Sequence, residues 1–179
     1  MFSDPLKNLK QFGISDHMIV ADLGAGSGFY SILASHMVPA GKVYAVEVVP
    51  DFIKTIQNKI KEQHIKNIDC ILGDVEKIGG TKIKDGIVDR VIASNILFQA
   101  EDKSKFLDEM KRILKPGGRV LLIDWAPEGE IMGGGFPSLA KEKARSMFEQ
   151  KGFTYEQDVD AGEHHYGMIY RKAISKSFS

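Results

Sequence analysis

Apolar and polar positions follow two different periods along the chain. Short apolar runs typical of buried strands alternate with segments in which apolar residues recur every three or four positions, as on one face of a helix. This alternation predicts an α/β fold in which a parallel sheet is covered by helices on both faces. The predicted strands are 18–23, 43–48, 68–72, 87–93 and 119–124, and the predicted helices are 28–37, 51–63, 103–113 and 138–151.

The period changes toward the C-terminus. Residues 153–159 and 166–171 are two extended runs joined by a short polar connection. Because a parallel crossover needs a longer connection, we expect these two strands to be antiparallel. Hydrophobic residues make up 43% of the 179 positions, which suffices for one core, and no linker or repeat interrupts the pattern. The chain is therefore predicted to form a single domain over residues 1–179.

The most specific motif joins the first strand to the first helix. Asp22 ends the strand, and Gly24, Gly26 and Gly28 follow at alternate positions. Glycines at this spacing let the backbone approach a ligand closely, beside the positive N-terminus of a helix. The dinucleotide fingerprint is absent, because Phe29 occupies the third-glycine position and Asp22 would repel a phosphate. A cationic ligand suits the loop better, and a nicotinamide-dependent oxidoreductase is the weaker alternative.

This loop resembles the first motif of the class I S-adenosylmethionine-dependent methyltransferases. Together with Gly-Asp-Val-Glu at 73–76 and Leu-Lys-Pro-Gly-Gly at 114–118, it is most similar to ubiquinone/menaquinone-type and related small-molecule methyltransferases. The resemblance covers nearly the whole chain and implies a doubly wound, Rossmann-like sheet of seven strands in the order 3-2-1-4-5-7-6, with strand seven antiparallel. It implies methyl transfer to a small-molecule or lipid-like acceptor, at oxygen, carbon or nitrogen, by in-line displacement.

The resemblance also implies which residues hold the cofactor. Ligands of such sheets bind beyond the carboxyl ends of the strands, where the strand order reverses. There Asp22 can accept from the ammonium of the methionine moiety, or it can bond the amides of its own loop instead. Glu47 stands where the family's acid binds both ribose hydroxyls, and Asp74 resembles the adenine contact, with a helix N-cap as its alternative role. The residues expected to bind S-adenosyl-L-methionine are Asp22, Gly24, Ala25, Gly26, Gly28, Glu47, Val48, Gly73, Asp74, Val75, Ser94 and Asn95.

The acceptor side is predicted from two strand ends. Ser94 and Asn95 leave the fourth strand and are expected to line the methyl-transfer channel. The reversed seventh strand brings His165 to the mouth of the pocket, where an imidazole can act as a base near neutral pH, or where it is only a surface residue. The candidate catalytic residues are therefore His165 and Asn95. No metal site is expected, because His164 and His165 are adjacent on a strand and point to opposite faces.

Charge and cysteine content narrow the partners. Lys and Arg together number 24, as do Asp and Glu, so no net field draws the chain to nucleic acid. The single cysteine, Cys70, excludes an internal disulfide and disfavours arsenite methylation, a chemistry that uses several cysteines. No run approaches a membrane-spanning length and no signal peptide is seen, so a cytoplasmic location is the default expectation.

The N-terminal segment leaves several alternatives open. Leu6, Leu9 and Phe12 predict a short amphipathic helix that packs on the domain or, less favoured, acts as a lid. Few residues precede the first strand, so the site is expected to be open. An open site would suit a large or membrane-held substrate, or completion by a second subunit in a homodimer. A non-catalytic partner subunit that retains the cofactor loop is a further alternative.

Overall fold

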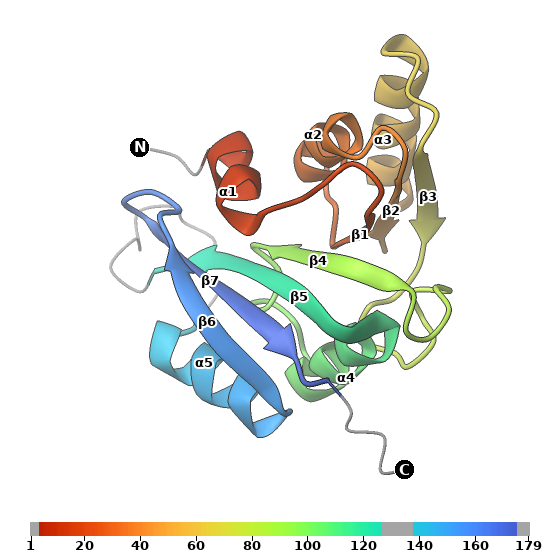
Figure 1. The fold of residues 1–179 in the computed structure, drawn as a ribbon. Coiled ribbons are helices and arrows are strands. Elements are labelled where there is room, and N and C mark those ends of the chain that lie inside the picture. Colours follow the sequence, from red (N-terminus) through yellow and green to blue (C-terminus); the bar gives the residue numbers. More distant parts are fainter. Residues whose placement is uncertain (1–3, 127–137, 175–179) are drawn as a thin grey trace.

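The computed structural model describes residues 4–126 and 138–174. Its centre is a sheet of seven strands in the order β3-β2-β1-β4-β5-β7-β6, as predicted (Figure 1). Neighbouring strands are parallel except that β7 is antiparallel to both β5 and β6. The strands are β1 (Ile19–Leu23), β2 (Lys42–Glu47), β3 (Ile68–Leu72), β4 (Val88–Ser94), β5 (Leu114–Trp125), β6 (Phe153–Val159) and β7 (His165–Lys172).

Helices cover both faces of the sheet. In Figure 1, α1, α2 and α3 lie on one side of it and α4 and α5 on the other. Each side has its own core of buried apolar side chains, with Leu9 and Ile56 in one and Phe106 and Phe148 in the other. Within the described ranges, no helix is long and apolar enough to cross a membrane. The helices are α1 (Pro5–Phe12), α2 (Phe29–Met37), α3 (Pro50–Glu62), α4 (Lys103–Ile113) and α5 (Lys141–Gln150).

The β5 strand departs from the prediction at its start. It begins directly after α4 at Leu114, which pairs with Val88, whereas the sequence predicted a turn at 115–118 and a strand from 119. The register then shifts, so that the next pair is Arg90 with Arg119. The extra residues form an irregularity within the strand rather than a separate turn. The Gly133–Gly135 segment, which the sequence marks as a flexible spot, lies outside the described residues.

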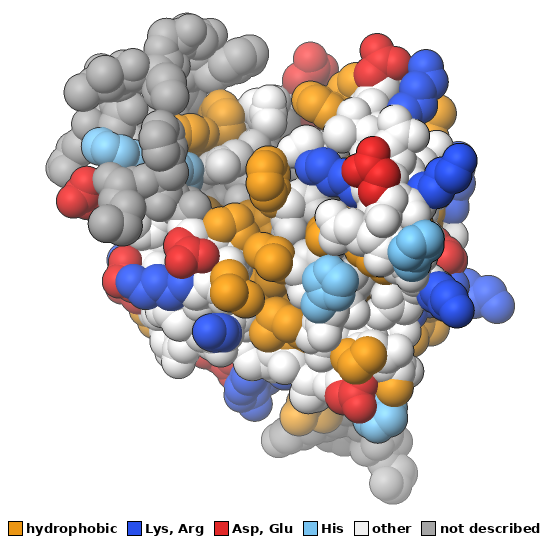
Figure 2. All heavy atoms as spheres, turned by 90° about the horizontal axis from the view of Figure 1, so that it is seen from above, with side chains coloured by type: hydrophobic (Ala, Val, Ile, Leu, Met, Phe, Trp, Pro, Cys, Tyr) orange, Lys and Arg blue, Asp and Glu red, His pale blue; other side chains and the backbone are white. Residues whose placement is uncertain are grey.

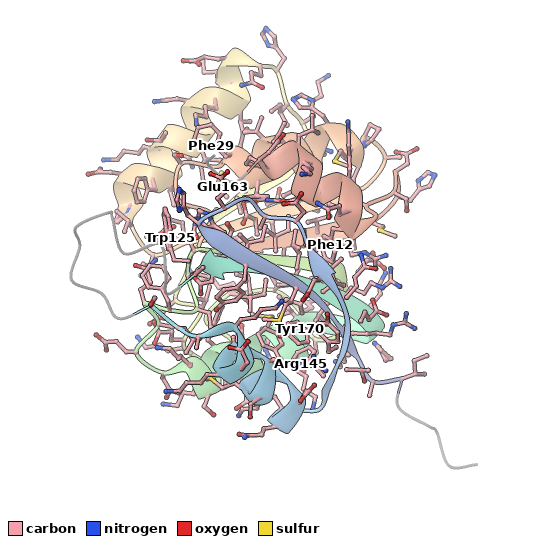
Figure 3. The ribbon with its side chains drawn as sticks, turned by 90° about the vertical axis from the view of Figure 1, so that its left-hand side faces the viewer. Phe12, Phe29, Trp125, Arg145, Glu163 and Tyr170 are labelled. Atoms are coloured by element: carbon pink, nitrogen blue, oxygen red, sulfur yellow. The ribbon has the colours of Figure 1, made fainter. Side chains whose placement is uncertain are left out.

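The N-terminal helix packs on the domain, as the favoured prediction has it. Asp4 caps α1 by accepting hydrogen bonds from the amides of Leu6 and Lys7. Leu9 and Phe12 are fully buried, whereas Leu6 is 41% exposed. On the opposite face of the sheet lies Tyr170 of β7, which is labelled in Figure 3. Its ring stacks on that of Phe148 in α5 with the centroids 4.0 Å apart. These contacts fix both helix layers to the sheet.

Candidate active site

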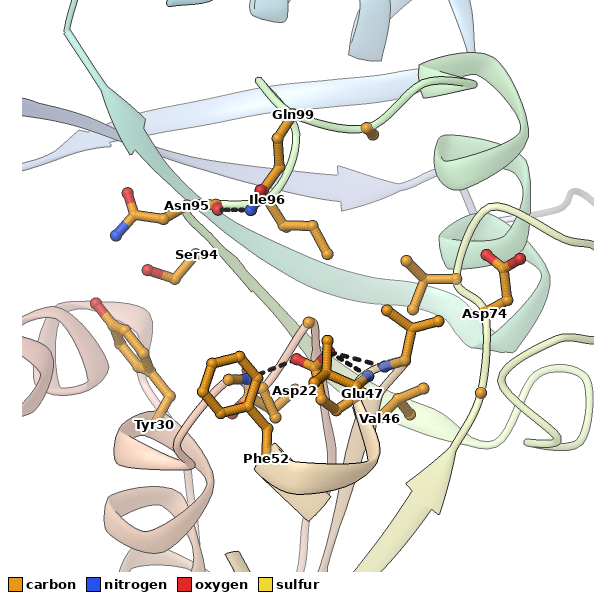
Figure 4. Close-up of a pocket in the computed structure, with 18 of the residues that line it drawn as sticks. Asp22, Tyr30, Val46, Glu47, Phe52, Asp74, Ser94, Asn95, Ile96 and Gln99 are labelled. Carbon is orange, nitrogen blue, oxygen red and sulfur yellow. Dashed lines mark hydrogen bonds between the residues drawn. The ribbon is translucent and has the colours of Figure 1, made fainter. Parts of the chain in front are cut away.

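A cavity of about 560 Å³ lies beyond the carboxyl ends of β1 to β4 (Figure 4). The strand order reverses between β1 and β4, which is where doubly wound sheets bind ligands. All of the predicted cofactor residues line this cavity except Gly28. The predicted catalytic residue Asn95 lines it as well, whereas His165 is not among the described lining residues.

The glycine loop brings backbone to the cavity in conformations that other residues rarely adopt. Gly24 and Gly26 have φ values of +73° and +51°. A Cβ on Gly24 would overlap the side chain of Ile96, whereas a Cβ on Gly26 would meet no protein atom within 4 Å. The space beside Gly26 is therefore open to a ligand. Gly28 has a different role, because it caps α2 with a φ of +83° and a Cβ there would lie 2.8 Å from Ile56 of α3.

Asp22 is a buried acid at the end of β1. Asp22 is only 2% exposed, and its Oδ2 accepts a hydrogen bond from Ser31 Oγ at 2.6 Å. The hydrogen-bond partner thus lies on α2, and not in the glycine loop as the alternative prediction had it. Burial raises the pKa of Asp22 to about 6, and the nearby Glu47 adds to the effect. A cation in the cavity would favour the ionised carboxylate.

Glu47 connects the end of β2 to the glycine loop. Its Oε2 accepts from the Gly26 amide at 2.8 Å, and its Oε1 accepts from the amides of Val48 and Val49 at 2.8 and 3.0 Å. A carboxylate has about four lone-pair sites, so roughly one remains open. The residue is 7% exposed and lines the cavity. A ribose diol would therefore donate one hydrogen bond to the free lone pair of the Glu47 carboxylate. Its second hydroxyl would donate to a carboxylate oxygen that already accepts from a backbone amide.

The turn after β3 forms another side of the cavity. A Cβ on Gly73 would lie 2.5 Å from the carbonyl oxygen of Gly80, because the turn folds back against the strand end. Asp74 Oδ1 accepts from the Glu76 amide at 3.0 Å, and its Oδ2 pairs with Lys77 Nζ at 2.9 Å. The hydrogen bond from Lys77 lowers the pKa of Asp74. No helix follows here, so the alternative role of Asp74 as a helix N-cap is wrong.

The exit of β4 holds an asparagine in an unusual conformation. Asn95 has a φ of +54°, a region that costs energy for residues other than glycine and that asparagine tolerates best. Its amide donates to Ile123 O at 2.8 Å, and its carbonyl accepts from Gln99 Nε2 at 2.7 Å (Figure 4). Its side-chain Oδ1 is buried and has no hydrogen-bond partner within the described part of the chain. This strained turn presents Asn95 and Ser94 to the cavity.

A family model described as a methyltransferase domain matches residues 14–173. The chain belongs to the class I S-adenosylmethionine-dependent methyltransferases. A solved structure of a SAM-dependent methyltransferase from Aquifex aeolicus is similar over 95% of this chain and 90% of that one, with a TM-score of 0.84 and 29% identity.

Two curated relatives are similar over shorter stretches. An arsenite methyltransferase of Halobacterium salinarum is 34% identical over 106 residues, which is 59% of this chain and 26% of that protein. A demethylmenaquinone methyltransferase of Lactococcus lactis is 31% identical over 119 residues, which is 66% of this chain and 46% of that protein. The chain thus spans less than half the length of these two relatives.

The cavity fits the cofactor of this family. Asp22 and Glu47 are buried carboxyl groups at the ends of neighbouring strands, where a cationic adenosyl ligand would gain from their charge. The pyrophosphate of a dinucleotide would be repelled by Asp22, which argues against the nicotinamide alternative. The open space beside Gly26 leaves room for the ligand.

Four exposed apolar residues form a rim of the cavity. Phe29, Phe52, Val48 and Val49 all line it, with exposed fractions of 66%, 43%, 62% and 41%. Hydrophobic side chains run in a band across the face of the molecule that Figure 2 shows. The ammonium of Lys59 lies 4.6 Å from the centre of the Phe29 ring. Of this rim, the sequence predicts only Val48, although Phe29 directly follows the glycine loop.

The N-terminal helix also contributes to the cavity. Pro5, its first residue, is part of the lining. Asn8 is fully buried, and its Nδ2 donates to the hydroxyl of Tyr30 at 2.8 Å. Tyr30 lines the cavity, so α1 supports a cavity residue besides packing on the domain. No pattern in the sequence indicates the contact between Asn8 and Tyr30, which joins two separate helices.

His165 lies at the start of β7, beside the end of β5. It is 9% exposed and pairs across the strands with Trp125, and the two rings lie in contact, tilted by 34°, with their centroids 4.1 Å apart. Burial lowers its pKa, and the charge of His164 adds to the effect, so both favour the neutral imidazole. Neither ring nitrogen has a hydrogen-bond partner in the described ranges. Its catalytic role stays a prediction.

Proposed function

We propose that this chain transfers a methyl group from S-adenosylmethionine to a small-molecule or lipid-like acceptor with an apolar ring system. The observation that carries the proposal is a single cavity that joins two buried acids, Asp22 and Glu47, to an exposed aromatic rim. The acids suit the adenosyl cofactor, whereas the phenylalanines of the rim suit an apolar partner.

Each part of the cavity has a distinct task in this proposal. Bound S-adenosylmethionine supplies a methyl group activated by a sulfonium leaving group. Glu47 would accept from the ribose, Asp22 from the ammonium, and Val48 would pack against the adenine. Ser94 and Asn95 would line the channel by which the acceptor arrives.

Positioning supplies most of the rate enhancement in such a reaction. Alignment of two reactants can contribute about 7–11 kcal/mol at its limit, so a catalytic base is optional. Where the acceptor carries a proton, the neutral imidazole of His165 is the candidate to accept it.

The acceptor class follows from the rim rather than from the cofactor loop. Phe29 and Phe52 offer flat apolar surfaces at the mouth, which favours a quinone-like ring over a small inorganic acceptor. One relative is named a demethylmenaquinone methyltransferase and another an arsenite methyltransferase. The single cysteine, Cys70, lies on β3 and is not among the described lining residues, which supports the first analogy over the second.

Labelled cofactor tests the proposal directly. The chain is incubated with methyl-labelled S-adenosylmethionine and a panel of apolar ring compounds bearing hydroxyl or quinone groups, and the label is followed into the organic phase. Transfer to a member of the panel, lost in Glu47→Ala and kept in Glu62→Ala, supports the proposal. Glu62 is an exposed acid at the end of α3, outside the cavity, and so is a matched control.

Two other outcomes would favour rivals. Binding of S-adenosylhomocysteine without transfer to any acceptor would favour a non-catalytic partner subunit. Stabilisation by NAD alone would contradict the cofactor assignment. The expected cytoplasmic location and the homodimer stay predictions, which cell fractionation and the mass of the purified protein in solution would test.

A further inference from the structure

The part of the cavity wall that follows β4 is an irregular turn, and hydrogen bonds from neighbouring segments hold it in place. Asn95, Ile96, Gln99 and Ala100 line the cavity, and Ile96 also fills the space above Gly24. Within the turn, the amides of Gln99 and Ala100 donate to Ile96 O at 3.2 and 3.1 Å. A segment without a regular backbone ladder depends on hydrogen bonds from outside to hold one shape.

One buried carboxylate reaches the middle of this turn. Asp124 Oδ2 accepts from the Phe98 amide at 2.9 Å, and Oδ1 accepts from the amide of Trp125 at 3.1 Å. Asp124 is the next-to-last residue of β5 and is fully buried. The ends of the segment are held separately, because the Asn95 amide donates to Ile123 O at 2.8 Å and Lys103 Nζ donates to Ala100 O at 2.6 Å.

We propose that Asp124 is a positioning residue for the cofactor cavity: through the Phe98 amide, its carboxylate holds the turn at 95–100 in the shape that lines the ligand. This inference rests on the proposed function, because the ligand in question is the adenosyl cofactor. Asp124 is not itself among the described lining residues, so it acts through the turn. An ionised carboxylate accepts more strongly than a neutral one, since charge-assisted hydrogen bonds are the stronger kind.

The surroundings of Asp124 make this anchor sensitive to pH. Burial is the largest effect and raises the pKa of Asp124 to about 7. The two amide hydrogen bonds and the charge of Lys103 in α4 act in the opposite direction and lower it. Tyr166 faces Asp124 from β7, and the carboxylate helps to raise the pKa of that phenol. Glu142 of α5 also raises the pKa of Tyr166, which therefore stays neutral in this range. Asp124 is thus the group in this cluster that changes charge near neutral pH.

The sign of the effect follows from the direction of the shift. Below a pH of about 7 Asp124 is protonated, and its bond to the Phe98 amide weakens. If only the ionised form holds the turn, ligand affinity should fall about tenfold between pH 8 and pH 6, following the ionised fraction. Asp124→Asn keeps an acceptor of the same size that does not titrate in this range.

The test uses the ligand-free chain first. In nitrogen-15 spectra of the wild type, the amide signals of Phe98, Ile96 and Gln99 should shift together with one midpoint near neutral pH. In Asp124→Asn these shifts should be absent, whereas Asp69→Asn, an exposed change on β3, should leave them as in the wild type. A Phe98 signal that does not titrate, or one that titrates while Ile96 and Gln99 stay fixed, would overturn the inference.

Ligand binding is then measured with 5′-methylthioadenosine. This probe lacks the amino acid part of the cofactor, so Asp22 should not affect its pH dependence. Affinity should fall as the pH is lowered in the wild type and in Asp22→Asn, and should vary by less than twofold in Asp124→Asn. A wild-type affinity that does not change with pH would overturn the inference. Failure of adenosyl ligands to bind at any pH would reject the proposed function, while the amide shifts would still decide whether Asp124 holds the turn.

Discussion

The carboxylate of Glu47 accepts a hydrogen bond from the amide of Gly26 at 2.8 Å, which ties the end of β2 to the glycine loop after β1. Both residues line the cavity. One side chain therefore shapes the loop and also presents the oxygen expected to meet the ribose. Such coupling orders the site before the ligand arrives, which lowers the entropic cost of binding.

Removing the Glu47 carboxylate should weaken cofactor binding strongly. Glu47→Ala leaves the amides of Gly26, Val48 and Val49 without their acceptor and removes the charged partner of the ribose. Loss of a hydrogen bond to a charged group costs about 1.5–3 kcal/mol, so affinity for S-adenosylhomocysteine should fall at least tenfold by calorimetry. Glu62→Ala should bind as the wild type does. Equal affinity of Glu47→Ala and the wild type would contradict the assignment of the ribose site.

Two glycines that both have a positive φ separate backbone strain from ligand contact. Gly13 and Gly26 have φ values of +69° and +51°, and a Cβ at either would meet no protein atom within 4 Å. Alanine at each position should therefore lower the free energy of unfolding by a similar amount, about 1–2 kcal/mol in urea titrations. Only Gly26→Ala should also lose affinity for S-adenosylhomocysteine, because only Gly26 lines the cavity. Unchanged binding by Gly26→Ala would show that the ligand does not approach this glycine.

The sequence could predict which strand ends meet, because that follows from the alternation of strands and helices alone. Asp22, Glu47 and Asp74 each end or follow a strand, and the carboxyl ends of parallel strands share one edge of the sheet. The structure accordingly places all three at one cavity. The whole strand order was also predicted, on the strength of the resemblance to a known family.

Contacts between segments distant in the chain could not be predicted in this way. The bond from the Phe98 amide to Asp124 depends on how the turn after β4 folds back on β5. Gly28 belongs to the glycine motif, yet its lack of a side chain accommodates Ile56 of α3 rather than a ligand. His165 does reach the carboxyl edge, but its ring packs against that of Trp125 and it is not among the described lining residues of the cavity. Each case was decided by side-chain packing, which a linear pattern does not contain.

The raised pKa of Asp22 predicts a pH dependence for ligands that carry an amino group. Burial raises the pKa to about 6, above the value of an unfolded chain, so ionisation costs folding stability as the pH rises through this range. An ammonium ion favours the ionised form, so affinity for S-adenosylhomocysteine should rise as the pH increases through about 6. In the Asp124→Asn background this rise should persist, and in the Asp22→Asn, Asp124→Asn double variant it should disappear. Calorimetric titrations between pH 5 and pH 8 would measure it, and a rise that persists in the double variant would rule out Asp22 as its source.

The apolar rim predicts a change in acceptor affinity that leaves the cofactor unaffected. Phe52 is 43% exposed and lines the mouth of the cavity, whereas Ile78 is 57% exposed and is not part of the described lining. Phe52→Ser removes an apolar surface that a ring-shaped acceptor would cover, so KM for that acceptor should rise about tenfold, as expected for burial of a side chain of this size. Ile78→Ser removes a comparable exposed surface elsewhere and should leave KM unchanged. Affinity for S-adenosylhomocysteine should stay within twofold of the wild type in both variants. A KM for the acceptor that rises equally in both would point to a general effect of surface polarity, and one that rises in neither would place the acceptor away from the rim.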